Sequence, residues 1–133
     1  MSGETDLKTL MQTMTARLDA SVYVFATLVS DTIPADITPR MMFEENEGTT
    51  YILKQSDAKR HNLPHEFPCK MITLDVHSSL EAVGFIAQIS GALAEEGMGV
   101  NPVSGFYHDH LFVPLGKEAD AMRILAQLSE PQI

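Results

Sequence analysis

Residues 80–114 read LEAVGFIAQISGALAEEGMGVNPVSGFYHDHLFVP, and the first half of this stretch has the pattern of an amphipathic helix. Its apolar side chains recur at helical spacing: Ala82, Ile86, Ile89 and Leu93. Ser78 stands three residues before Glu81, which is the spacing of a capping box, and Gly97 is a natural C-terminal stop. The sequence therefore predicts a helix that begins near Ser78 and ends before Gly97.

Two strands are predicted after this helix, over Met98–Tyr107 and His110–Leu115. Between them, Tyr107–Asp109 is expected to form the tip of a hairpin, because Asp and His tolerate turn conformations and stay hydrated there.

The regions on both sides of residues 80–114 complete a known order of strands and helices. Before it, Lys70–His77 alternates in the manner of a half-buried strand, and after it Lys117–Ser129 has the modest apolar stripe of a closing helix. The order β-α-β-β-α is that of a ferredoxin-like unit that lacks only its last strand. We therefore predict an α+β fold with antiparallel sheets and helices on one face.

The N-terminal half begins with a second predicted helix, over residues 5–18, capped by Thr5 or Asp6. Five apolar side chains share its helical spacing: Leu7, Leu10, Met11, Met14 and Leu18. Val22–Val29 follows as a central strand, apolar on both faces, and residues 30–39, which contain two prolines, are predicted to be a connection.

A hairpin is predicted next, because the strand-like runs Arg40–Glu45 and Thr49–Lys54 flank a short link that contains glycine. Ser56–Asn62 is expected to be a short helix, and His61–Pro68 a linker punctuated by prolines.

These elements suggest two modules, residues 1–66 with an extra N-terminal helix and residues 67–133. Two complete ferredoxin-like units need four strands each, whereas the pattern provides only six in all. We expect either the N-terminal strand or a strand of another chain to complete the second sheet, which would tie the halves into one body.

The charge balance excludes several partners. The 133 residues contain nine Lys and Arg against eighteen Asp and Glu, a formal charge of -9 that repels nucleic acid and anionic membranes alike. The acidic start MSGETDLKTL does not resemble a signal peptide, and the single cysteine cannot form an intrachain disulfide. We therefore expect a cytoplasmic protein.

The triplet His108-Asp109-His110 is the most obvious candidate for a metal site. It supplies at most two imidazoles, whereas zinc normally takes three or four ligands, so we favour a hydrated turn, with no metal and no cofactor. The alternative is a metal-dependent enzyme or metal binder that uses these three residues together with His77 or a linker histidine.

A second set, His61, His65 and Cys69, recurs every four residues as ligands on a helix would. Pro64 and Pro68 would break that helix, so we expect no metal here and a small buried thiol at Cys69.

Two loops of the second module, residues 77–85 and 95–102, have a composition that suits a small zwitterion. The first precedes the predicted helix, whose N-terminal N–H groups favour a carboxylate. In the second, Gly97 and Gly99 let the chain pass close to a ligand and Asn101 offers a donor and an acceptor. We expect both loops at one end of the sheet. The alternative is that these glycines form only a helix stop and a tight strand entry.

Residues 80–114 resemble the core of an ACT domain, in which a loop with a glycine precedes an apolar helix and a small-residue turn leads into the second strand. Gly84 and residues 97–101 hold those places, and residues 108–114 resemble the hairpin of the aspartokinase-type branch. The N-terminal half resembles the first module of small stand-alone proteins built of two ACT-like units. The resemblance therefore implies tandem ACT-like modules.

ACT modules are regulatory, bind amino acids in clefts between paired units and commonly pair side by side. The resemblance implies a ligand site made of Ser78, Val83, Gly84, Phe85, Met98, Gly99, Val100, Asn101 and Asp109. It implies a non-enzymatic sensor that binds an amino acid or similar small molecule, forms a homodimer and acts on a separate protein target. The alternatives are the metal-dependent activity above and a purely structural assembly module.

Overall fold

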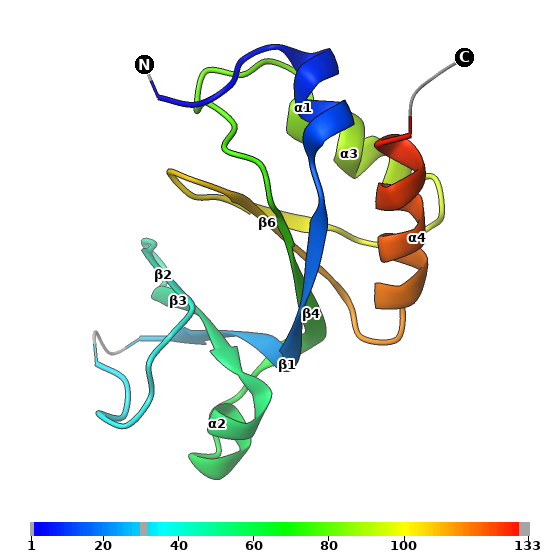
Figure 1. Ribbon diagram of the computed structural model, residues 1–133. Helices are drawn as coiled ribbons and strands as arrows, with labels where there is room; N and C mark the ends of the chain where they lie inside the picture. Colours follow the sequence, from blue (N-terminus) through cyan, green and yellow to red (C-terminus); the bar gives the residue numbers. More distant parts are fainter. Residues whose placement is uncertain (1, 30–31, 131–133) are drawn as a thin grey trace. The chain divides into compact units, whose positions relative to one another are not determined.

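The computed structural model describes residues 2–29 and 32–130, which belong to two compact units (Figure 1). Unit 1 comprises residues 1–20 and 70–133, and unit 2 comprises residues 21–69. The units therefore differ from the two consecutive modules expected from the sequence, because the first 20 residues group with the C-terminal half.

The sheet of unit 1 has the strand order β1-β4-β6-β5. Its strands are β1 (Ala16–Leu28), β4 (Glu66–Leu74), β5 (Asn101–Ser104) and β6 (Asp109–Pro114). Only residues 16–20 of β1 and residues 70–74 of β4 belong to unit 1, and the rest of these two strands belongs to unit 2. β5 and β6 pair antiparallel, with Asn101 opposite Phe112 and Ser104 opposite Asp109. This sheet is the predicted ferredoxin-like arrangement.

β1 supplies the strand that the second module lacks in the sequence pattern. Beside its start, the Asp75 N–H donates to the Thr15 carbonyl at 2.6 Å, and further along the Lys70 ammonium donates to the Ala20 carbonyl at 2.8 Å. Of the two expected sources, the N-terminal strand of the same chain completes the sheet.

Helices α1 (Leu7–Thr13), α3 (Phe85–Ala94) and α4 (Glu118–Leu128) cover one face of this sheet. Alternate residues of the strands meet apolar residues of all three helices in one core: Leu10, Met11, Met14, Ile72, Leu74, Phe85, Ile89, Leu93, Met98, Leu111, Val113, Ala121, Ile124 and Leu125. Within residues 2–29 and 32–130, no helix is long and apolar enough to cross a membrane.

α1 is shorter than predicted. Its N-cap is Asp6, as expected, whose side chain accepts a hydrogen bond from the Thr9 N–H at 2.9 Å. It ends at Thr13, however, and Leu18 lies in β1 with 42% of its surface exposed. The prediction of a helix to residue 18 was wrong, because hydrogen bonding to the segment around Asp75 draws the chain into a strand.

The N-cap of α3 lies six residues later than the capping-box spacing suggested, at Gly84 instead of Ser78, so the helix begins at Phe85. The Ser78 hydroxyl does not cap the helix but donates a hydrogen bond to Asp109 Oδ2 at 2.8 Å. The strand expected over residues 98–107 is limited to β5, and the following turn is closed by a hydrogen bond from the Gly105 N–H to the His108 carbonyl. Asp109, expected at the tip, is the first residue of β6.

Unit 2 is built around the predicted hairpin of β2 (Met41–Glu44) and β3 (Thr49–Lys54), followed by the short helix α2 (Gln55–Arg60). β3 also pairs antiparallel with β1, from Tyr23 opposite Lys54 to Leu28 opposite Thr49. A separate apolar core fills this unit: Val24, Ala26, Ile37, Tyr51, Leu53 and Ala58. The predicted linker extends only to His65, because β4 already begins at Glu66.

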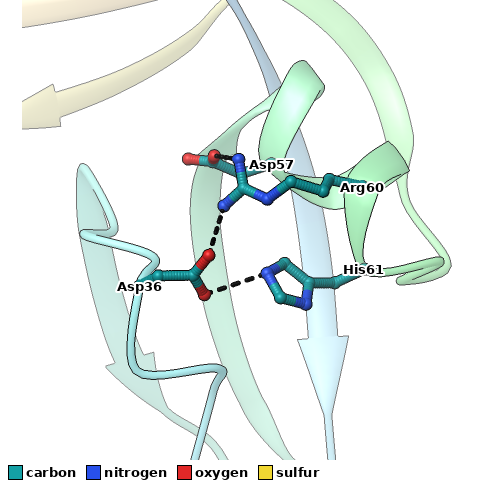
Figure 2. A network of polar contacts seen from close by, with 4 residues as sticks. All are labelled: Asp36, Asp57, Arg60 and His61. Carbon is teal, nitrogen blue, oxygen red and sulfur yellow. Dashed lines mark hydrogen bonds and ion pairs between the residues drawn. The ribbon is translucent and has the colours of Figure 1, made fainter.

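The connection before β2 is held to α2 by a polar network (Figure 2). Asp36 lies between two cationic or polar groups, with Oδ2 2.8 Å from Arg60 Nη2 and Oδ1 2.9 Å from His61 Nε2. Arg60 Nη1 also contacts Asp57 Oδ1 at 3.0 Å. The contact with His61, together with the charge of Arg60, holds the pKa of Asp36 below its ordinary value of 3.8.

We expect Asp36→Asn to lower the melting temperature at neutral pH, because the charged form of this carboxylate is the one that the folded network favours. A group with a lowered folded-state pKa stabilises the protein above its ordinary pKa and loses that effect as pH falls through the folded value. The gap between variant and wild type should therefore close below pH 3.8. Thermal unfolding followed by circular dichroism at neutral pH and below pH 3.8 checks this. An equal difference in melting temperature at both pH values would contradict it.

Candidate ligand-binding site

The loop that leads into α3 ends in a backbone conformation that favours glycine. Gly84 has φ +89°, and its side-chain-free position is the N-cap of α3, where no side chain caps the helix. The first N–H groups of a helix have no partner within it and carry partial positive charge. Next to them, Val83 is 83% exposed. The start of α3 therefore presents main-chain donors beside an accessible loop.

The nine residues that the sequence predicted as ligand contacts fall into two groups. Ser78, Phe85, Met98 and Asp109 are buried, and Val83, Gly84, Gly99, Val100 and Asn101 are half-buried or exposed. Phe85 and Met98 belong to the core of unit 1, so a ligand could reach only their main chain.

Ser78 and Asp109 bind each other. The Ser78 hydroxyl donates to Asp109 Oδ2 at 2.8 Å, and only 7% and 5% of the two residues is exposed. A buried carboxyl group needs such a partner. In this structure the pair fastens the loop to the beginning of β6.

The N-terminal segment lies directly along the same loop. The Glu4 N–H donates to the His77 carbonyl at 2.9 Å, and the Ser79 N–H donates to the Glu4 carbonyl at 2.8 Å. A Cβ on Gly3 would lie 2.7 Å from the Ser79 nitrogen, and Gly3 has φ +94°. The Ser79 N–H, one of the donors expected for a ligand, therefore has a partner within the chain.

The two loops that were expected at one end of the sheet lie at opposite ends of α3. Gly84 precedes this helix of 10 residues and Gly97 follows it, and a helix of that length extends about 15 Å. Gly97, with φ +79°, accordingly serves as the helix stop. The expectation failed because a helix that runs back along the strands places the loop before it and the loop after it at opposite ends of those strands.

The structure instead brings the β5–β6 turn to the loop before α3. The His77 ring lies 5.2 Å from the Tyr107 ring and 6.3 Å from the Phe106 ring, between centroids. Phe106 and Tyr107 remain 57% and 62% exposed. The sequence reasoning missed this aromatic cluster. The adjacent Phe106-Tyr107 pair, where the predicted strand meets the predicted hairpin tip, was the available signal, since exposed large apolar side chains beside a turn indicate a contact surface.

The arrangement of the histidines does not fit the metal alternative. Neighbouring strand residues point to opposite faces, so Asp109 and His110 diverge. His110 Nδ1 lies 2.9 Å from Thr73 Oγ1, and His108 Nε2 lies 3.4 Å from Asp75 Oδ1. Among the residues that the structure describes, no three His, Cys, Asp or Glu side chains are grouped to hold a metal ion.

Cys69 is fully buried, and its thiol contacts the Tyr23 carbonyl with Sγ at 3.3 Å. Burial raises its pKa to about 12. The thiol therefore packs as a small apolar group, as the sequence predicted.

Models of the ACT domain match residues 2–70 and 66–127, so the chain belongs to the ACT domain family and contains two such domains in tandem. The two matches meet at residues 66–70, next to the expected module boundary, whereas the compact units place residues 1–20 with the second domain. No curated protein matches the sequence.

Solved structures extend this assignment. A protein of unknown function from Vibrio cholerae, described as a possible transport protein, is 36% identical, with a TM-score of 0.82 over 97% of this chain and 100% of that one. An Agrobacterium tumefaciens protein is 17% identical, with a TM-score of 0.71 over 87% and 89% of the two chains. The regulatory subunit of aspartate kinase from Thermus flavus is 11% identical, with a TM-score of 0.65 over 87% and 97%. The last two share the fold alone.

Proposed function

We propose that this chain is a non-enzymatic regulatory protein that binds an amino acid through the loop at residues 77–84 and the start of α3. The observation that carries the proposal is the N-terminus of α3, which Gly84 opens without any side-chain cap beside the exposed Val83. Membership of the ACT domain family supports it, because ACT domains are typically regulatory and bind amino acids.

The ligand's carboxylate would accept hydrogen bonds from main-chain N–H groups at Val83, Gly84 and Phe85, where the helix dipole favours negative charge. Ser78 and Asp109 would hold the loop in place through their mutual hydrogen bond. The aromatic cluster of His77, Phe106 and Tyr107 would provide an apolar surface for the rest of the ligand.

Met98, Gly99, Val100 and Asn101 lie beyond the other end of α3 and would complete the site only from a second copy. In a symmetric dimer, each surface of one copy meets the complementary surface of the other, so two-fold pairing can bring opposite ends of the same helix together. We therefore propose a homodimer with the amino acid between copies. The bound amino acid would favour one arrangement of the modules, and the dimer in that arrangement would act on a separate target protein.

Two glycine variants test the ligand site. Gly84→Ala should weaken amino-acid binding, because a residue with a Cβ is strained at φ +89° and the helix start would shift. Gly91→Ala is the control, since this glycine lies within α3 with nothing within 4 Å of its would-be Cβ. Calorimetric titration with the common amino acids measures both, and sedimentation with and without ligand measures the dimer.

Loss of binding in Gly84→Ala with normal binding in Gly91→Ala would support the proposal. Absence of binding by every amino acid at millimolar concentration would refute it, and a stable dimer in that case would favour the structural assembly module instead.

A further inference from the structure

Unit 2 contains a cavity of about 270 Å³. None of the residues proposed above for amino-acid binding contributes to its lining. Its walls come from three places in the unit: Tyr23, Thr38, Pro39, Arg40 and Lys54. Two of these five residues are cationic and two carry hydroxyl groups. That composition is unusual in a chain with a formal charge of -9.

Local structure brings these groups together. Tyr23 of β1 stands directly opposite Lys54, the last residue of β3. The Arg40 N–H donates to the Ile52 carbonyl at 2.7 Å, which fixes the residue beside β3 just before β2 begins. Pro39 precedes it with a restricted φ, so the segment that carries Thr38 and Arg40 follows a defined path to the cavity.

The Arg40 side chain is held in place by Tyr23. Its Nη2 donates to the Tyr23 hydroxyl at 2.9 Å, and its guanidinium carbon lies 5.5 Å from the centroid of the Tyr23 ring. Tyr23 itself is only 2% exposed and holds this end of the side chain in place. A guanidinium has five N–H donors in a planar fork, so the bond to Tyr23 leaves most of them for another acceptor.

No carboxylate of the described residues neutralises either cation of this cavity: the ion pairs of the unit involve Arg60 and His61 instead. Asp36 and Asp57, the acidic residues of the neighbouring connection and helix, are both engaged in that network (Figure 2). Arg40 and Lys54 therefore keep their charge available.

We infer that this cavity binds the oxyanion of a small molecule, a carboxylate or a phosphate, between Arg40 and Lys54. The guanidinium fork would take two oxygens of the anion, the Lys54 ammonium would add a charge-assisted bond, and the Thr38 hydroxyl would donate a further one. The volume suits a small molecule and excludes a macromolecular ligand from its interior. This inference does not depend on the amino-acid site proposed for unit 1.

The test is a nuclear magnetic resonance titration of the full chain with two probes, inorganic phosphate and succinate, at constant ionic strength set with sodium chloride. We expect saturable shifts of the backbone signals of Thr38, Arg40 and Lys54. Lys54→Gln should raise the dissociation constant about tenfold, the worth of one charge-assisted hydrogen bond. The control is Lys59→Gln, which removes the same charge from α2 outside the cavity.

Saturation by phosphate alone would identify a phosphate ligand, and saturation by succinate alone or by both would identify a carboxylate-tolerant site. Either result supports the inference if Lys54→Gln weakens binding and Lys59→Gln does not. Shifts that never saturate, or equal weakening in both lysine variants, would overturn it, because they would reflect only the general charge of the surface.

Discussion

Replacing Leu10 with alanine should lower the free energy of unfolding by about 2–5 kcal/mol, the range for emptying a leucine site in a packed core. Leu10 is fully buried in α1 and packs in the core of unit 1. Because α1 joins that core, the loss should destabilise unit 1 and not only the helix.

Leu18→Ala is the matched control for this variant. The sequence places both leucines on one helical stripe, but Leu18 lies in β1 with 42% of its surface exposed, so its truncation should cost only a fraction of the Leu10 value. Urea unfolding followed by circular dichroism measures both, since the chain has no tryptophan. Equal costs would contradict this difference in burial between Leu10 and Leu18.

The second large effect is expected at Ser78. Ser78→Ala removes the donor from the buried Asp109 carboxyl group, and leaving such a group without its partner costs about 1–3 kcal/mol. Adding Asp109→Leu to the variant should recover part of this loss, because both members of the pair are then apolar.

Ser90→Ala provides the comparison, because the Ser90 hydroxyl in α3 is buried without a hydrogen-bond partner in the described structure. The same chemical change there should be neutral or stabilising, since alanine favours helices and no bond is lost. Thermal unfolding of the three variants separates the cases. If Ser78→Ala proved as harmless as Ser90→Ala, the bond between Ser78 and Asp109 would not hold the loop.

Local patterns predicted several elements correctly. β2 and β3 follow from two strand-like runs around a glycine link, and α4 follows from its spaced apolar residues, with bounds one residue inside the predicted Lys117–Ser129 at each end. In these cases the residues that decide the structure are neighbours in sequence. The ferredoxin-like order and the ACT resemblance rested on the same kind of signal, and the family assignment confirms them.

The candidate site was predicted less completely. The family resemblance placed Gly84 correctly before α3, whereas the capping-box spacing put the start of the helix and its N-cap at Ser78. The competing bond comes from Asp109, 31 positions away, which no local spacing can reveal. The aromatic cluster of His77 and Tyr107 depends in the same way on two segments that only the fold brings together.

By itself, the sequence determined the class of fold, the turns that glycine and proline require, and the acidic surface, because each depends on side chains that are close along the chain. Only the tertiary structure decided where α1 ends, which strand completes the second sheet and which donors of the loop stay available. Those outcomes depend on backbone hydrogen bonds between distant segments, such as Thr15 with Asp75 and Glu4 with Ser79, which form wherever folding brings the partners into register.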